Sequence, residues 1–331
     1  MTTDPAAKSA ADARSAADDA VETLQTVRDW LRYGVSRFNA AGLVYGHGAS
    51  NALDEAAFLI LHTLNLPIDQ LDPWLEARLT RGERGAVRDV IEARVLTRKP
   101  APYLTNAAYI GNHRFYVDER VIVPRSYIGE LLVRDGLSAV IEEPARVGRV
   151  LDLCTGSGCL AILAALAFPE AQIDATDLSP DALAVAARNV ADYQLGERLH
   201  MLQGDLFAPV HGRRYDLIIA NPPYVARAEA EAFPPEYAAE PPLAHRGGED
   251  GLDLVRRILA EAQDYLAANG KLIVELGIGR HILEAERPEL PFFWLDTEES
   301  EGEVFALKAS DLSAAAGKVF RSGSQADPGS G

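Results

Sequence analysis

Four consecutive residues, Asn221, Pro222, Pro223 and Tyr224, are of types that together could hold a planar nitrogen group and make it reactive. The lone pair of an amide or exocyclic amine nitrogen is delocalised, so such a nitrogen is a poor nucleophile unless its N–H groups are held. Asn221 offers a side-chain carbonyl, the prolines can direct a backbone carbonyl the same way, and Tyr224 offers a flat face. These four residues are our candidate catalytic set. The alternative interpretation is a proline-rich turn after a strand.

A second candidate site is a loop of small residues that follows an apolar run at residues 150–153. Small residues let the backbone approach a ligand closely, and the loop leads directly into an Ala- and Leu-rich stretch that predicts a helix. Gly156, Gly158 and Ala161 also fit the G-x-G-x-x-A form of a dinucleotide fingerprint, so the loop alone does not separate a nicotinamide cofactor from S-adenosylmethionine. The loop residues that we assign to cofactor binding are Cys154, Thr155, Gly156, Ser157 and Gly158.

Three carboxylates near this loop favour S-adenosylmethionine. Asp152 directly precedes the loop, where a dehydrogenase of this type usually carries no acid, and its charge could draw a cationic amino-acid headgroup. Asp177 ends the next expected strand, where it could accept from both hydroxyls of a ribose in either cofactor, and Asp205 is placed to accept from an adenine amino group. The alternatives are a satisfied buried acid for Asp152 and a helix N-cap or solvated loop acid for Asp205.

From residue 149 onward, short β-type runs alternate with helical stretches, and this alternation predicts the elements that position the candidate residues. Strand and helix in alternation imply a mostly parallel sheet that is covered on both faces, which is an α/β fold. The expected strands are residues 150–153, 172–176, 199–202, 217–220, 272–276, 292–295 and 304–307, and the expected helices reach about residue 168 and span residues 181–193 and 252–267.

The rest of the chain divides by pattern and composition. Apolar residues at helical spacing predict a small helical domain, to which we assign substrate recognition. A change to β-type residues predicts a β-hairpin linker, and both ends of the chain are polar and are expected to be disordered. The expected parts are a tail at residues 1–20, the helical domain at 21–100, the hairpin linker at 101–125, the catalytic domain at 126–311 and a tail at 312–331.

Length and composition indicate a soluble protein of more than one domain, because its 331 residues are 48% hydrophobic and 24% charged. The sequence contains no run of roughly 18 uncharged apolar residues that could span a membrane. The N-terminus lacks the charged-then-apolar layout of a signal peptide. We therefore expect a cytoplasmic protein with no membrane partner.

Charge and cysteine content narrow the chemistry further. A formal net charge of -17 argues against an enzyme that grips a nucleic-acid backbone over a large area, and it would suit a basic protein partner. The alternative is that the acidity only keeps the protein soluble. Cys154 and Cys159 lie close together without a second pair or a His cluster, so neither a disulfide framework nor a zinc site is supported, and we expect no metal.

The order of these features resembles class I S-adenosylmethionine-dependent methyltransferases, and specifically the protein glutamine methyltransferases that modify translation proteins. Residues 121–126 contain the Val-Pro-Arg-Ser form of the ribosomal-protein branch, whereas the release-factor branch usually reads Ile-Pro-Arg-Pro-Glu-Thr. The Cys-Thr-Gly-Ser-Gly-Cys segment at residues 154–159 is also similar to the ribosomal-protein branch. The resemblance spans about residues 25–312 and departs from the usual pattern at Tyr127, where Pro is common, and in the polar tails.

The resemblance implies a Rossmann-like sheet of seven strands, the last of them antiparallel, with Asn221 and Tyr224 at the end of the fourth strand. It implies S-adenosyl-L-methionine as the cofactor, with Leu178 and Leu206 beside Asp177 and Asp205 in its site. Asn221 is expected to bind the cofactor as well as the target amide. It also implies, as substrate, a glutamine side chain of large-subunit ribosomal protein number three. Methylation of the Gly-Gly-Gln glutamine of peptide chain release factors is the alternative with the same chemistry.

Three other classes of function fit the sequence less well. A nucleic-acid adenine amino methyltransferase also uses an Asn-Pro-Pro-Tyr type motif, but a strongly basic recognition domain should then appear, and none does. A nicotinamide-dependent oxidoreductase fits the glycine loop but leaves residues 221–224 without a purpose. A catalytically silent assembly factor is disfavoured because every mechanistic position is filled.

Overall fold

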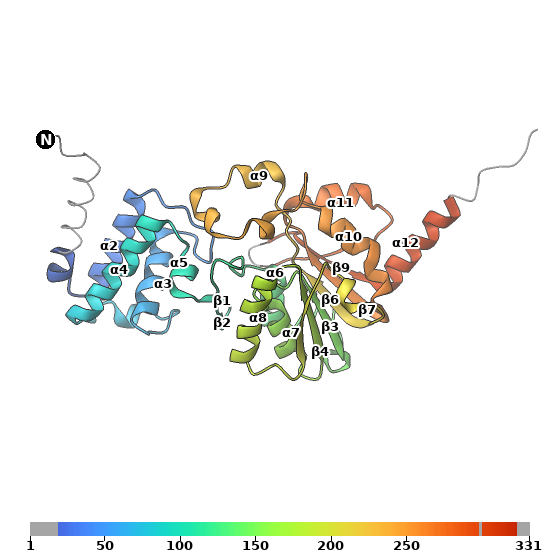
Figure 1. Cartoon of the computed structure of the whole chain (residues 1–331), viewed down its shortest axis with the longest axis horizontal. Helices are drawn as coiled ribbons and strands as arrows, with labels where there is room; N and C mark the ends of the chain where they lie inside the picture. The colour runs from blue at the N-terminus through green and yellow to red at the C-terminus, as the bar shows by residue number, and fades with distance from the viewer. Residues whose placement is uncertain (1–18, 298–299, 323–331) are drawn as a thin grey trace, which may run out of the picture. The chain divides into compact units, whose positions relative to one another are not determined.

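The computed structural model describes residues 19–297 and 300–322, with the backbone alone described for residues 316–322 (Figure 1). The chain folds into two compact units. Unit 1 comprises the chain up to Ala107 together with the short segment Pro234–Ala239, and unit 2 comprises Ala108–Phe233 and the chain from Glu240 onward. Unit 1 therefore includes a segment that begins ten residues after Tyr224, the last of the candidate catalytic residues. No pattern in the sequence predicted that this segment packs in unit 1.

Unit 1 is helical, and its main helices begin at side-chain caps. Thr26 and Thr80 each form a capping box with the acid three residues later, so the first backbone N–H groups of two helices are satisfied. Trp30 and Phe38 are fully buried in the core between the helices. The helices of unit 1 include α2 (Val27–Ala40), α3 (Ala52–Thr63), η1 (Asp72–Trp74), α4 (Arg81–Thr97), α5 (Ala101–Thr105) and, in the later segment, η4 (Pro235–Ala239).

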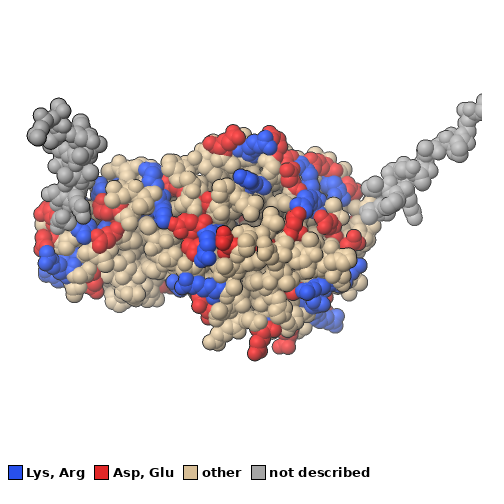
Figure 2. Space-filling view, viewed as in Figure 1, with Lys and Arg blue, Asp and Glu red and all other residues tan. Residues whose placement is uncertain are grey.

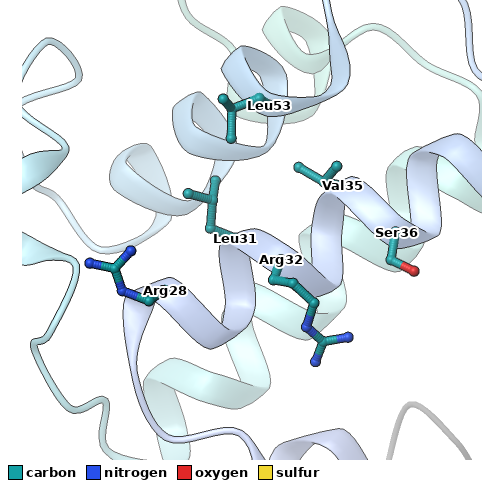
Figure 3. A pocket seen from close by; sticks show the side chains of 6 residues that line it. All are labelled: Arg28, Leu31, Arg32, Val35, Ser36 and Leu53. Carbon is teal, nitrogen blue, oxygen red and sulfur yellow. The ribbon is translucent and has the colours of Figure 1, made fainter.

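A shallow pocket lies on the surface of unit 1 between α2 and α3 (Figure 3). Its apolar wall comes from Leu31, Val35 and Leu53, and two arginines, Arg28 and Arg32, extend from α2 beside it. None of the residues that line it belongs to the candidate catalytic or cofactor set.

Unit 2 is built on a seven-stranded sheet with the order β5-β4-β3-β6-β7-β9-β8. The first five strands in this order are parallel, and β9 runs antiparallel to both of its neighbours. The expected α/β fold, with an antiparallel last strand, is therefore confirmed. The strands are β3 (Arg149–Leu153), β4 (Gln172–Asp177), β5 (Leu199–Gln203), β6 (Tyr215–Ala220), β7 (Leu266–Glu275), β8 (Phe293–Leu295) and β9 (Val304–Lys308).

Helices cover both faces of the sheet. Alternate strand residues point to opposite faces, and because they are apolar on both, each face has to be buried. Val150 packs with α6, α7 and α8 in one apolar core, and its neighbour Leu151 packs with α10, α11 and α12 in the other (Figure 1). The α-helices of unit 2 are α6 (Tyr127–Asp135), α7 (Cys159–Ala167), α8 (Pro180–Asp192), α9 (Arg227–Glu231), α10 (Asp253–Glu261), α11 (Arg280–Glu286) and α12 (Ala309–Ser322).

A β-hairpin opens unit 2, formed by β1 (Ala108–Ile110) and β2 (His113–Phe115) around a turn at Gly111-Asn112. The hairpin is shorter than the expected linker at residues 101–125, because α5 occupies its first part and residues 116–126 form no strand. Asn189 on α8 joins the end of the hairpin to the glycine loop, since its side chain bonds the backbone of Tyr116 and the carbonyl of Ser157.

Two expectations about secondary structure were wrong. The helix expected over residues 252–267 ends earlier, as α10 and a short 3-10 turn, because Leu266 already pairs with Tyr215 as the start of β7. The expected C-terminal tail from residue 312 begins as helix α12, because Leu312 and Ala315 are buried against the sheet. Most of the expected N-terminal tail and residues 323–331 lie outside the described residues. Among the helices described, none has the length and apolar character needed to cross a membrane.

Candidate active site

All candidate site residues lie at or just beyond the carboxyl ends of neighbouring parallel strands. Asp152 lies in β3, Asp177 ends β4, Asp205 follows β5, and Asn221 follows β6. The strand order reverses direction at β3, and ligands of open α/β sheets bind at such a switch point. The fold therefore brings together residues that are far apart in the sequence.

The glycine loop is fixed to the sheet by Asp152, which is fully buried. The Oδ2 atom of Asp152 accepts from Thr155 Oγ1 at 2.5 Å and from the backbone N–H of Ala161 at 3.1 Å. Its Oδ1 atom is buried and accepts no hydrogen bond from the described residues. A buried acceptor without a partner is costly, so this atom suits a donor brought by a ligand.

Burial raises the pKa of Asp152 from its ordinary 3.8 to about 7. Between these two values the folded protein holds a proton that the unfolded chain has released, so the free energy of unfolding falls as pH rises through this window. We expect Asp152→Asn, which keeps an acceptor for Thr155 and Ala161, to lack this fall. Its stability relative to the unsubstituted protein should therefore be higher at pH 8 than at pH 5, measured by urea denaturation without cofactor. If the difference in stability between Asp152→Asn and the unsubstituted protein were the same at both pH values, the raised pKa of Asp152 would be contradicted.

Asp177 also holds the glycine loop, through a hydrogen bond to its backbone at Gly156. Its carboxylate accepts from the backbone N–H of Gly156 at 2.8 Å and from that of Ser179 at 2.9 Å. Burial raises the pKa of Asp177, and these N–H groups oppose the rise. A carboxylate has about four acceptor positions, so about two remain for other donors. The next residue, Leu178, is 55% exposed.

The end of β5 is held against β4 by a bond from Gly204 N to Asp177 O, which places the start of the Asp205 loop beside Asp177. Asp205 is half exposed and forms an ion pair with Arg257 at 2.8 Å. Leu206 is only 4% exposed, and Phe207 is fully buried in the core.

The amide of Asn221 is oriented by the backbone of Arg125. Asn221 Nδ2 donates to the carbonyl oxygen of Arg125 in a long hydrogen bond of 3.4 Å. A carbonyl oxygen can only accept, so the amide nitrogen faces Arg125, and Asn221 Oδ1 is directed to the other side.

Tyr224 contacts a buried carboxylate that the sequence analysis missed. Its hydroxyl donates to Glu275 Oε1 at 3.3 Å, at the end of β7. Glu275 is 1% exposed, and its Oε2 atom accepts from Ser126 Oγ at 2.7 Å and from Ile128 N at 3.4 Å. Burial raises the pKa of Glu275 to about 7 and that of Tyr224 above its usual range. The one signal in the sequence was a charged residue inside the apolar run at 272–276.

The backbone around Tyr224 is covered by residues 246–251. Val225 and Arg246 form a parallel bridge, and Gly247 N donates to Val225 O at 3.1 Å. At Gly251, with φ +85°, an added Cβ would lie 2.2 Å from the carbonyl oxygen of Tyr224, so a side chain cannot be accommodated there.

A second buried acid, Glu240, holds the segment before α6. It accepts from Val123 N at 3.0 Å and pairs with Arg125 at 2.9 Å, and His245 Nε2 lies 3.1 Å from its Oε2 atom. This acid therefore supports the same Arg125 whose carbonyl orients Asn221. No group of His, Cys, Asp and Glu among the described residues could hold a metal ion.

This sheet order, with a glycine loop and an Asn-Pro-Pro-Tyr segment at its switch point, defines a Rossmann-like methyltransferase. The model of the methyltransferase small domain family matches residues 135–233.

The chain is also similar to curated proteins over most of its length. It is 55% identical over 291 residues to the ribosomal protein uL3 glutamine methyltransferase of Bordetella pertussis, covering 88% of this chain and 97% of the relative. It is 55% identical over 300 residues to that of Burkholderia pseudomallei, with 88% and 97% covered. Among solved structures, a methyltransferase from Pyrococcus furiosus is 16% identical with a TM-score of 0.41, covering 66% of this chain and 92% of that one. The chain belongs to the ribosomal protein uL3 glutamine methyltransferase family.

Proposed function

We propose that this chain transfers a methyl group from S-adenosylmethionine to the side-chain amide nitrogen, N5, of a glutamine in ribosomal protein uL3, large-subunit ribosomal protein number three. The observation that carries the proposal is the orientation of Asn221, whose amide nitrogen faces the Arg125 carbonyl and whose oxygen is directed to the other side. The names of the relatives support uL3 as the substrate. The reaction takes place where ribosomal proteins are made, in the cytoplasm.

The four candidate catalytic residues form a clamp for the target amide. Asn221 Oδ1 and the Pro222 carbonyl accept its two N–H groups, Pro223 holds the turn, and the Tyr224 ring lies along its plane. With both N–H groups held, the amide cannot rotate, and its nitrogen lone pair is presented in one direction. As the new C–N bond forms, positive charge grows on this nitrogen, and the two carbonyl dipoles stabilise it more in the transition state than before. The extra proton then leaves to water.

The cofactor, when bound, would supply the methyl group, whose bond to the sulfonium sulfur would break as the C–N bond forms and would leave its electron pair on the sulfur. The residues at the ends of β3, β4 and β5 fit it, because Asp152 Oδ1 is a buried acceptor without a partner among the described residues. That atom suits the cationic amino-acid end of the cofactor. The acceptor positions that remain on Asp177 suit ribose hydroxyls, and Asp205 suits an adenine amino group. The backbone of residues 154–158, with Leu178 and Leu206, completes the proposed site.

Unit 1 recognises the substrate protein in this proposal. The chain enters unit 1 at Pro234, ten residues after Tyr224, and leaves it after Ala239. Within unit 1, Glu236 is fully buried and accepts from Arg98 at 2.6 Å and from Val44 N at 3.0 Å, while Tyr237 packs on His47. A protein bound to unit 1 is thereby linked, along the chain, to the clamp residues.

The charge distribution on one face of the described residues, together with the formal net charge of -17, supports a protein substrate over a nucleic acid. On the face shown in Figure 2, the Lys and Arg side chains of the described residues are interspersed with Asp and Glu and do not gather in one patch. An extended grip on a phosphate backbone needs clustered positive charge. We therefore expect no extensive nucleic-acid contact by this enzyme.

The test is methylation of purified uL3 by the purified chain with S-adenosylmethionine that carries a labelled methyl group. We expect one methyl group per uL3 molecule, located on a glutamine by mass spectrometry of peptides. Peptide chain release factor serves as the comparison substrate and should be methylated far more slowly. Preferential methylation of the release factor, or methylation of neither protein, would contradict the proposal. Cells without the gene should contain uL3 lighter by one methyl group.

A further inference from the structure

We propose that Glu275 is a positioning residue that holds the ring of Tyr224 in place as the wall of the amide clamp. The inference rests on the proposed function, because it assigns Glu275 a part in the same reaction. Glu275 does not touch the substrate in this arrangement. It acts through Tyr224, and its effect is on the geometry of the clamp.

Glu275 is well placed to hold Tyr224, because it is itself immobilised. It is the last residue of β7, whose neighbour β6 leads into the clamp, and it is 1% exposed. Its Oε2 atom is bound by Ser126 Oγ and Ile128 N at the start of α6. With one oxygen occupied, Oε1 is left facing the hydroxyl of Tyr224. A buried carboxylate in a network of this kind has one preferred arrangement.

A second contact fixes the face of the Tyr224 ring. Gly277, two residues after Glu275, has φ +59°, and an added Cβ would lie 2.8 Å from ring atom Cδ2. The backbone therefore lies directly against the ring. Glu275 binds the hydroxyl at one end of the ring, and the backbone of Gly277 lies against one side. Both contacts therefore come from the end of β7 and the residues just after it. The clamp is thus shared between the ends of β6 and β7.

The start of α6 connects this tether to the other half of the clamp. Arg125 accepts from the Asn221 amide, and the next residue, Ser126, donates to Glu275. Asn221 and Tyr224 are therefore held from the same stretch of chain, one by a backbone carbonyl and the other through Glu275. A displacement of about 1 Å in such a site can cost about a hundredfold in rate, so loss of the tether should be visible in kcat.

The experiment is a double-mutant cycle with Glu275→Gln, Tyr224→Phe and the two combined. Glutamine keeps the size of the side chain but removes its charge, and phenylalanine keeps the ring but removes the tether. We expect each single variant to lower kcat on uL3 about tenfold, with cofactor affinity changed by less than about twofold. In the Tyr224→Phe background, Glu275→Gln should lower kcat by no more than about a further twofold, because the tether is already absent.

A matched control is available in the same sheet. Asp174 in β4 is also a buried carboxylate that accepts from a tyrosine hydroxyl, with Tyr215 at 2.7 Å. Asp174→Asn makes the same change from a carboxyl group to an amide, away from the clamp. We expect it to lower the melting temperature while kcat on uL3 stays unchanged, which separates loss of stability from loss of positioning.

Three results would overturn the inference while leaving the proposed function intact, because the unsubstituted protein would still methylate uL3. The first is full kcat in Glu275→Gln. The second is an equal loss from Glu275→Gln in both backgrounds, which indicates independent effects. The third is full kcat in Tyr224→Phe, which would show that the hydrogen bond between Tyr224 and Glu275 has no role. This result can be obtained even where Glu275→Gln does not fold. Failure of the unsubstituted protein to methylate uL3 would instead overturn the proposed function.

Discussion

Asn221→Ala is expected to lower kcat for methylation of uL3 on the order of a hundredfold to a thousandfold, while cofactor affinity changes little. The reason is that one of the two carbonyl dipoles that face the target nitrogen is removed. Loss of one such preorganised dipole typically costs about 3 to 4 kcal/mol in the barrier. The Arg125 carbonyl also loses its partner, the Asn221 amide. Single-turnover rates with saturating cofactor, and cofactor binding by titration calorimetry, measure the two effects separately.

A second substitution at the same position tests why an amide is needed there. Asn221→Asp keeps an oxygen for the substrate but places another oxygen against the Arg125 carbonyl, where the amide nitrogen now lies at 3.4 Å. Two acceptors cannot share a hydrogen bond, so the side chain should turn away, and we expect a loss close to that of alanine. Activity near that of the unsubstituted protein in either variant would contradict the assignment of Asn221.

The strands were predictable because their apolar runs end at polar residues with a recognisable role. The run before Asn221 is an example: the expected strand at 217–220 is the last part of β6, and all four residues are fully buried. The same reasoning placed Asp177 at the end of β4. Local pattern was sufficient in these cases because a central parallel strand is buried on both faces and its sequence shows it.

Glu275 was not predictable, because its role is defined by residues far away in the sequence. Its partners Ser126 and Tyr224 lie 149 and 51 positions away. A single acid in an apolar run indicates equally well a strand end or an exposed position. The same limit applies to Pro234–Ala239, which packs in unit 1 through Glu236 although its chain neighbours belong to unit 2. Contacts of this kind depend on tertiary structure, which local patterns do not contain.

The misplaced helix end has a related cause. Residues 262–267 continue a pattern that suits a helix, but Leu266 pairs with Tyr215 in the sheet. Pairing and burial in a sheet override local preference. The C-terminal error is different, because Ala309, Leu312 and Ala315 recur at helical spacing and are buried. There the polar composition of the chain end concealed a real apolar stripe.

Asp177→Ala is expected to weaken binding of S-adenosylmethionine about a hundredfold or more, with a small effect on kcat at saturating cofactor. Each hydrogen bond to a charged acceptor contributes about 1.5 to 3 kcal/mol, and the proposed site uses two of them for the ribose hydroxyls. The substitution also leaves the N–H groups of Gly156 and Ser179 without their acceptor, which loosens the glycine loop. Calorimetric titration measures the cofactor affinity. Thermal melting without cofactor measures how much stability the protein loses when the glycine loop loses its two hydrogen bonds to Asp177.

Two further variants separate the ribose contacts from the loop contacts. In Asp177→Asn, the amide nitrogen must face either Gly156 N or Ser179 N, which are both donors, so this variant should bind cofactor about as poorly as alanine. Asp205→Ala removes an acid that is half exposed and paired with Arg257, and it should cost only about tenfold. If Asp177→Ala bound cofactor as tightly as the unsubstituted protein, the assignment of Asp177 to the ribose would be wrong. If Asp205→Ala bound cofactor more weakly than Asp177→Ala, the ribose contact would be assigned to Asp205 and the adenine contact to Asp177.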